Sequence, residues 1–115
     1  MKPILLVAGM MAFLFLAAPN PANAQKRKHV RTLTGKIKMY ECGDNCYLTV
    51  TDKRGKEHTG LCSAAACQSW NDKAEMPKRF VGRRVRVTVG RGKQYDGSGT
   101  VQGTMASFKR IVYLK

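Results

Sequence analysis

Residues 32–62 decide the fold, and they read TLTGKIKMYECGDNCYLTVTDKRGKEHTGLC. Apolar and polar side chains alternate on both sides of the turn sequence CGDN, and this period of two predicts strands with one buried face each. Pairing Ile37 with Val50 and Met39 with Leu48 brings four apolar side chains together on that face. We therefore expect an antiparallel hairpin at the start of the domain.

The turns determine which strands are neighbours. The register above leaves residues 42–45 as a four-residue hairpin loop. The next turn, DKRG, places Gly55 where a left-handed conformation closes a hairpin between Asp52 and Lys56. The third strand, which ends at Cys62, then lies beside the second. The stretch thus predicts a three-stranded meander.

The alternation stops after this meander. Residues 63–75, SAAACQSWNDKAE, have alanine, glutamine and tryptophan at helical spacing, with Ser63 as the cap, and Met76-Pro77 ends the segment. Ala66 and Trp70 are four residues apart and share one face of such a helix. We expect one short helix of roughly two to three turns between the third and fourth strands.

The C-terminal part of the chain indicates two further strands. In residues 78–90, KRFVGRRVRVTVG, the valines face one way, while arginine and threonine face the other. The glycine-rich residues 91–99 are expected to form a loop. The last strand, within residues 100–114, changes phase at residues 106–108, and this change predicts a bulge or a bend.

This order of elements resembles that of the OB-fold, a five-stranded Greek-key barrel, with the helix between strands three and four. The first strand is long and contains Gly35, which suits a strand that curves to serve both sides of a barrel. FVGRRVRVTV looks like the fourth strand of such domains. The chain is also similar to small exported bacterial proteins of OB type without an established activity. We expect a mainly β, OB-type domain over residues 32–115.

The N-terminus has the pattern of an export signal. Lys2 precedes an uncharged apolar run at residues 4–18, and Ala-Asn-Ala at residues 22–24 fits the small-x-small cleavage rule. The run is short for a membrane span. We therefore predict a signal peptide over residues 1–24, a basic arm over residues 25–31, no transmembrane segment after cleavage, and a periplasmic or secreted protein.

Export also indicates what the cysteines do. Outside the cytoplasm thiols oxidise, and small exported domains use disulfides to supplement thin cores. The spacings C-x3-C and C-x4-C differ from the C-x2-C pairs of zinc sites and redox centres, so we expect two structural disulfides and no metal. Local pairs are favoured because their thiols meet early, while the crossed pairings stay open. The cysteines are Cys42, Cys46, Cys62 and Cys67.

The chain is strongly basic, with a formal net charge of +14 at pH 7 from 21 lysines and arginines against seven acidic residues. Such an excess attracts polyanions, namely nucleic acid, anionic lipid headgroups, lipopolysaccharide or acidic glycans. The histidines and the scattered acids form no convincing catalytic triad, phosphate loop or metal cluster, and His58 is best explained as an ordinary strand residue. We expect an anionic-polymer-binding protein, not an enzyme, with no cofactor.

The resemblance to OB domains implies where such a ligand binds. These domains commonly bind chain-like ligands across strands two and three, flanked by the loops between strands one and two and between strands four and five. Aromatic platforms beside basic side chains are what single-stranded nucleic acid binding uses. The expected anion- or nucleic-acid-binding residues are Lys36, Lys38, Tyr40, Tyr47, Arg84, Arg86, Arg91, Lys93 and Tyr95.

Two other functions stay open from the sequence alone. A glycan- or envelope-ligand module, as in OB-fold toxin subunits that bind sugars, would use Trp70 and the tyrosines to stack on sugar faces. An envelope scaffold would dock its basic surface on anionic lipid or lipopolysaccharide, which is a peripheral contact with the membrane surface. The sequence does not indicate the oligomeric state.

Overall fold

The computed structural model describes residues 31–115. The predicted signal peptide and residues 25–30 of the predicted basic arm lie outside this range. Arg31, expected as the last residue of that arm, instead begins the first strand, where it pairs with Val89. Regular structure therefore extends one residue further toward the N-terminus than the sequence predicted.

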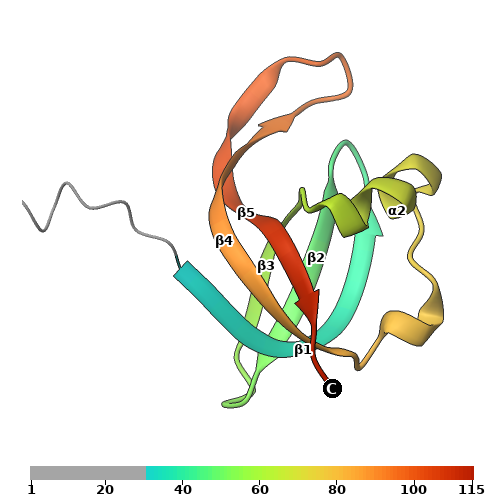
Figure 1. Ribbon diagram of the computed structural model, residues 1–115. Helices are drawn as coiled ribbons and strands as arrows, with labels where there is room; N and C mark the ends of the chain where they lie inside the picture. Colours follow the sequence, from blue (N-terminus) through green and yellow to red (C-terminus); the bar gives the residue numbers. More distant parts are fainter. Residues whose placement is uncertain (1–30) are drawn as a thin grey trace, which may run out of the picture.

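The described chain forms a closed five-stranded barrel with the strand order β1-β2-β3-β5-β4 (Figure 1). Neighbouring strands are antiparallel except β3 and β5, which pair in parallel through Leu61 and Ser107. This connectivity is that of an OB-type barrel, so the predicted fold is confirmed. The elements are β1 (Arg31–Cys42), β2 (Cys46–Asp52), β3 (Glu57–Cys62), η2 (Ala65–Cys67), α2 (Gln68–Lys73), η3 (Lys78–Phe80), β4 (Arg84–Tyr95) and β5 (Val101–Tyr113).

The barrel interior is filled by alternating apolar side chains. Val85, Val87 and Val89 of β4 are buried, whereas Arg84 before them and Arg86 between the first two are exposed. Period-two alternation therefore identified this strand correctly. The core cluster that these valines join is completed by Ile37, Leu48, Val50, Cys62, Ala64, Cys67, Trp70, Met76 and Phe108.

Gly35 lies where β1 passes from one neighbouring strand to the other. Its register partners are Val85 on β4 and Asp52 on β2. A Cβ atom at this position would collide with the carbonyl group of Thr51, so only glycine allows β1 and β2 to approach so closely. The inner glycine thus lets β1 serve both sides of the barrel, in agreement with the sequence.

A bulge at Lys38 changes the phase of β1. Ile37 pairs as predicted, but the register then shifts by one residue. The predicted pairing of Met39 with Leu48 is wrong, because Tyr40 takes that place. Since an inserted residue moves every later side chain to the opposite face, Met39 is 39% exposed and Tyr40 packs against the core.

The two turns of the meander are tight. Cys42 pairs with Cys46, so the first loop consists of residues 43–45 and is one residue shorter than predicted. The second turn forms as predicted, with its glycine in the left-handed conformation and a 2.9 Å hydrogen bond from the Asp52 N–H to the Lys56 carbonyl. The meander of β1, β2 and β3 is therefore confirmed.

A short helix forms between β3 and β4, but it is smaller than predicted. A 3-10 turn, η2, precedes α2, and Ser63 does not cap either element, because its hydroxyl group hydrogen-bonds the hydroxyl of Ser107. Trp70 is buried as expected, whereas Ala66 is half-buried and Cys67 takes the other inward position. The segment closes one side of the barrel.

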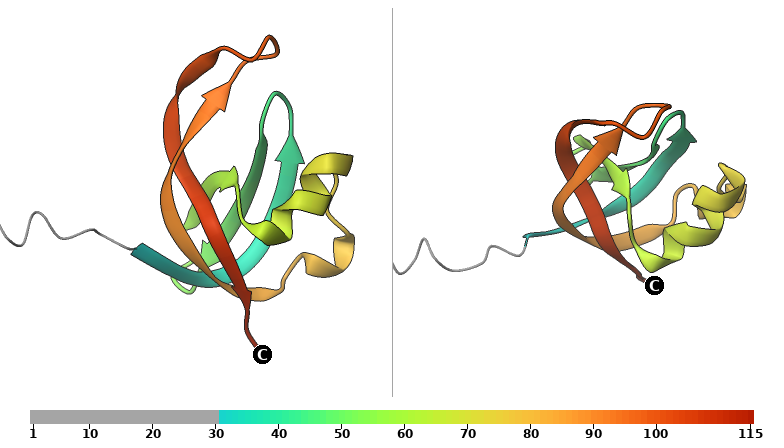
Figure 2. Two further views of the ribbon diagram at one scale, coloured as in Figure 1. Left: turned by 45° about the horizontal axis from the view of Figure 1, so that its top comes forward. Right: turned by 90° about the horizontal axis from the view of Figure 1, so that it is seen from above.

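β4 and β5 form a long hairpin whose tip extends beyond the rest of the barrel (Figure 2). The prediction that residues 91–95 belong to a loop is wrong, because they continue β4. Asp96 organises the connecting turn by accepting backbone hydrogen bonds from Ser98 and Thr100. The predicted phase change in β5 is a bulge at Lys109, one residue beyond the expected position.

Candidate anion-binding surface

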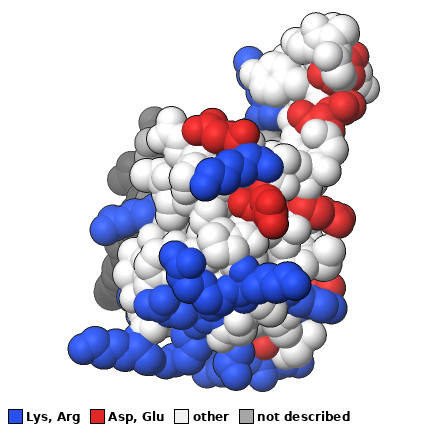
Figure 3. All heavy atoms as spheres, turned by 90° about the vertical axis from the view of Figure 1, so that its right-hand side faces the viewer, with Lys and Arg blue, Asp and Glu red and all other residues white. Residues whose placement is uncertain are grey.

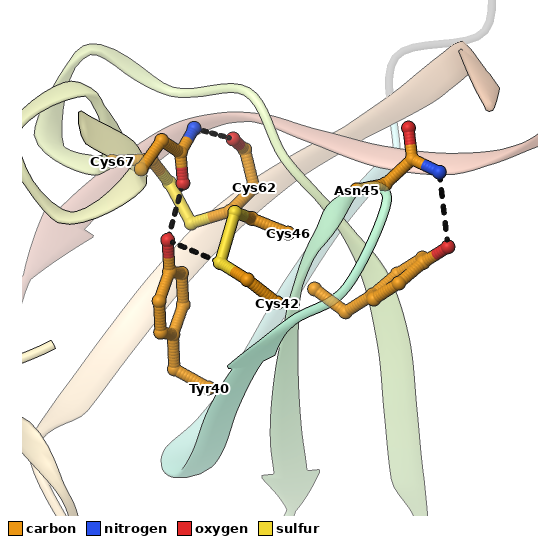
Figure 4. Close-up of a disulfide and its surroundings, with 8 residues drawn as sticks. Tyr40, Cys42, Asn45, Cys46, Cys62 and Cys67 are labelled. Carbon is orange, nitrogen blue, oxygen red and sulfur yellow. Dashed lines mark hydrogen bonds between the residues drawn. A yellow bond between two sulfur atoms is a disulfide. The ribbon is translucent and has the colours of Figure 1, made fainter. Parts of the chain in front are cut away.

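Two local disulfides staple the end of the barrel where β1 meets β2 and β3 meets η2 (Figure 4). Cys42 is joined to Cys46 with Cα atoms 4.0 Å apart, and Cys62 is joined to Cys67 with Cα atoms 5.7 Å apart. The favoured local pairing is confirmed, and the crossed pairings are wrong. Residues 31–115 contain no free thiol, so the cysteines of this part of the chain have a structural role.

Tyr40 is part of this stapled end rather than a surface platform. Its hydroxyl group donates a hydrogen bond to Asn71 and lies 3.2 Å from Cys42 Sγ (Figure 4). Its ring meets Trp70 edge-on at a centroid distance of 5.7 Å, and burial raises the pKa of Tyr40. The Tyr40 ring is therefore packed against other side chains of the protein.

The Trp70 ring is also packed inside the protein. Only 4% of this residue is exposed, and its ring contacts Phe80 at a centroid distance of 5.0 Å in addition to Tyr40. A sugar ring needs an open indole face on which to stack. The sequence-based idea that Trp70 stacks on a glycan is therefore wrong.

The two loops that flank the usual OB ligand face are bonded to each other. The Asn45 amide donates a 2.8 Å hydrogen bond to the Tyr95 carbonyl and accepts a 3.0 Å bond from the Tyr95 N–H. Tyr47 lies beneath this bridge, where its hydroxyl accepts hydrogen bonds from Asn45 and Gln94. We call residues 43–45 and 94–100 the loop pole. Its polar groups are largely satisfied internally.

The face of β2 and β3 below the loop pole is also covered. Thr49 and Leu61 point away from the core by strand alternation, yet each is only 7% exposed. The backbone of the β4–β5 hairpin covers Leu61, because a Cβ atom at Gly92 would lie 2.9 Å from Leu61 Cδ1. The hairpin therefore occupies part of the surface on which OB domains commonly bind chains.

The predicted binding residues of the hairpin lie on its other face. Arg91, Lys93 and Tyr95 alternate with Gly92 and Gln94, so they project away from β2 and β3. All three are exposed. They do not form one surface with the cations at the start of β4, since the length of that strand separates them.

Charge is unevenly distributed over the molecule. On the face that contains α2 and η3, basic side chains gather in the half near η3 and the start of β4, while acidic side chains gather mainly in the other half (Figure 3). The acids at the end of β1, at the loop pole and along the segment that follows β3 are Glu41, Asp44, Asp72, Glu75 and Asp96.

The end of the barrel opposite the loops has the densest group of cations. Lys36 on β1 lies directly opposite Arg84 on β4, and both line, with Lys53, a groove of about 750 Å³. None of the three forms a salt bridge within residues 31–115. We call the following group of exposed cations the basic pole: Lys36, Lys53, Arg79, Arg83, Arg84 and Arg86.

Both acids near the basic pole are already engaged. Asp52, which also lines the groove, bonds the His58 ring at 2.9 Å and the Lys56 N–H at 3.0 Å, and these bonds lower the pKa of Asp52 to about 2. Glu57 forms an ion pair with Lys38. Lys38, a predicted binding residue, is therefore neutralised, while the cations of the basic pole are not.

The structure thus places the predicted site residues in separate parts of the molecule. Lys36, Arg84 and Arg86 come together at the basic pole, whereas the tyrosines are bonded elsewhere and the hairpin residues stand apart. Sequence reasoning missed Lys53, Arg79 and Arg83. The signal for the arginines was the run KRFVGRR, in which cations flank aromatic and apolar residues ahead of β4.

Two further features are absent from the described part of the chain. Residues 31–115 contain no group of histidine, cysteine and acidic side chains placed to hold a metal ion. Within the same range, no helix has the length and apolar character needed to cross a membrane. No protein-family model matches this chain, and neither the curated proteins nor the solved structures contain a significant match.

Proposed function

We propose that this chain is an exported, non-catalytic protein that binds an anionic polymer through the basic pole. The observation that carries the proposal is the separation of charge on the face that contains α2 and η3 (Figure 3). The cations of the basic pole have no acid in salt-bridge range among residues 31–115. Such a surface concentrates a polyanion near it and releases counterions when the polyanion binds.

The opposed pair Lys36 and Arg84 supports this proposal. Like charges that face each other across neighbouring strands destabilise a sheet. No described acid relieves this repulsion, because Asp52 and Glu57 have other partners. Arg84 donates a 2.6 Å hydrogen bond to the main-chain oxygen of Lys115, and an anionic group bound between Lys36 and Arg84 would relieve the repulsion that remains.

The polymer would be held by its charges rather than by its rings. Strong stacking needs open aromatic faces, which single-strand-binding proteins provide. Here Tyr40 and Tyr47 are engaged internally, and the rings of Phe80 and Tyr113 each have an arginine above them. Nucleic acid, lipopolysaccharide and acidic glycans all supply the charge that this mode of binding requires.

The second candidate function is an envelope-ligand module or scaffold that binds lipopolysaccharide, an acidic glycan or anionic lipid. The predicted signal peptide favours it, because an exported protein meets envelope polymers directly. The basic pole serves this function in the same way. The two candidates differ in the polymer and not in the binding surface.

A salt titration tests the proposal. The protein lacking residues 1–24, with its disulfides intact, is titrated against a fluorescent single-stranded oligonucleotide, lipopolysaccharide and a sulfated glycan at increasing salt concentration. We expect a log–log slope of about −3 to −4 for the oligonucleotide, as about five neutralised phosphates would give. An affinity that hardly changes with salt for all the polymers would remove the basis of the proposal.

The predicted export is tested separately. The full chain is expressed in a bacterium, and the N-terminus of the protein in the periplasm or medium is sequenced. We expect it to begin at Gln25, directly after the Ala-Asn-Ala site. Full-length protein in the cytoplasm would contradict the prediction.

A further inference from the structure

Two arginines of the basic pole lie on aromatic rings. The guanidinium carbon of Arg79 is 4.7 Å from the centroid of the Phe80 ring, and that of Arg83 is 4.7 Å from the centroid of the Tyr113 ring. The two rings are neighbours with centroids 5.6 Å apart, and Phe80 contacts the buried Trp70. The arginines therefore rest on rings that the core holds in place.

Both guanidinium groups lie near the same phenol. Burial raises the pKa of Tyr113, and the charges of Arg83 and Arg79 oppose that rise. Arg79 and Tyr113 also line a common pocket of about 570 Å³. Arg83 lies over the Tyr113 ring and Arg79 shares a pocket with it, so two positive groups lie close to one phenol.

These two arginines have unused hydrogen-bond donors. Within residues 31–115, neither forms a salt bridge, and neither guanidinium donates a hydrogen bond to a protein acceptor. Glu75 lines the same pocket but does not pair with Arg79. Stacking restricts the plane of each guanidinium, so less conformational freedom is lost when an anion binds to its edge.

We propose that Arg79, Arg83 and the Tyr113 hydroxyl form a preorganised site for a terminal phosphate monoester of the polymer. This inference rests on the proposed function and names the group that the polymer presents. One guanidinium fork can satisfy both oxygens of a carboxylate, whereas two forks and a hydroxyl match a group with three terminal oxygens. A phosphate monoester has three such oxygens and about two negative charges at neutral pH.

The test compares ligands that differ only in this group. A 5′-phosphorylated oligonucleotide is compared with the same oligonucleotide ending in a 5′-hydroxyl, and diphosphoryl lipid A is compared with monophosphoryl lipid A. We expect about a fivefold to tenfold preference for the additional monoester in one of the two arms, and that arm identifies the source of the phosphate. The variant R79K/R83K retains both charges but loses the fork and the stacking, so the preference should disappear.

The control variant R31K/R110K changes two exposed arginines outside the basic pole and should keep the preference. Unchanged circular dichroism and thermal midpoint establish that both variants are folded. Salt-dependent binding without any preference for the monoester, or a preference that survives in R79K/R83K, would overturn this inference and leave the proposed function intact. Loss of salt dependence in the wild-type protein would instead contradict the proposed function.

Discussion

The two ends of this barrel use their polar groups in opposite ways. At the loop pole, Asn45 bonds both backbone groups of Tyr95, and Tyr47 accepts bonds from the same region. At the basic pole, Lys36 and Arg84 face each other, and no described acid pairs with either. Asn45 and Tyr47 are thus bonded within the protein, whereas Arg84, which donates to the Lys115 main-chain oxygen, is the only cation of the basic pole with a side-chain hydrogen bond inside residues 31–115.

If the proposed function holds, this difference means that a barrel of OB type can bind away from its customary loops. A buried or bridged polar group contributes to stability, and it must give up that bond before it can bind a ligand. Here the bridge between the loops and the hairpin over Leu61 occupy part of the customary face. At the opposite end, Arg84 donates to the main-chain oxygen of Lys115, whereas Lys36 and Lys53 form no side-chain hydrogen bond or salt bridge within residues 31–115. The predictions below test this contrast.

The largest effect is expected from adding one methyl group at each end. Gly35→Ala places a Cβ against the carbonyl of Thr51 near the basic pole, whereas Gly43→Ala at the loop pole meets no atom within 4 Å. The first variant should lose about 3 kcal/mol or more of unfolding free energy, because backbone cannot move aside as a side chain can. The second should lie within about 0.5 kcal/mol of wild type. Urea denaturation measures both, and equal losses would contradict the close approach of β1 and β2.

The second-largest effect is expected from removing the disulfides. Removing Cys62–Cys67 as C62A/C67A should cost about 3 kcal/mol, because lost loop closure is joined by a cavity at the fully buried Cys67. Removing Cys42–Cys46 as C42A/C46A should cost about 2 kcal/mol from loop closure alone. Thermal denaturation of both variants, compared at equal pH, gives the order. The reverse order would show that the Cys42–Cys46 disulfide contributes more to the stability of the loop pole than the hydrogen bonds there suggest.

A smaller effect is expected when the bridge of the loop pole is cut. Asn45→Ala removes both hydrogen bonds to Tyr95 and should cost about 1–2 kcal/mol. The Tyr95 amide should exchange its hydrogen faster, which NMR measures directly. Polymer affinity at fixed salt should not change, since the basic pole lies at the other end. A clear change in affinity would mean that the two poles are not independent.

The smallest effect concerns acid sensitivity near the basic pole. The hydrogen bond from His58, followed by that from the Lys56 N–H, lowers the pKa of Asp52 from its ordinary 3.8 to about 2. Because the folded-state pKa lies below the unfolded one, the contribution of this carboxylate is present above about pH 4 and is lost as the pH falls toward 2. Asp52→Asn should therefore flatten the stability profile between these values. Denaturation curves of the wild type and of Asp52→Asn at several pH values test this, and parallel stability profiles would contradict it.

The sequence was informative where the chain follows a simple period. Alternation predicted the meander and the inward valines of β4, and the short spacings favoured the local disulfides. The order of elements was enough to indicate the barrel.

The remaining features depend on contacts between distant parts of the chain. The bulge at Lys38 arises where β1 changes partners, and alternation does not show it, so Tyr40 and Met39 were assigned to the wrong faces. Glycines suggested a loop at residues 91–95, but Gly92 allows a strand to approach Leu61 closely. The proposed phosphate-binding role of Arg79 and Arg83 depends on β5, which places Tyr113 beside Phe80, and the local sequence does not show this contact.

The most direct test of the account neutralises the two candidate surfaces separately. The triple variant K36Q/K53Q/R84Q acts at the basic pole, and R91Q/K93Q acts on the hairpin, with the salt dependence of oligonucleotide binding measured for each. We predict that the first variant loses about tenfold to a hundredfold in affinity at low salt and that its log–log slope becomes shallower by about 2, whereas the second keeps the wild-type slope. A shallower slope for the hairpin variant, with wild-type behaviour for the triple variant, would place binding on the outer face of the β4–β5 hairpin and contradict the account.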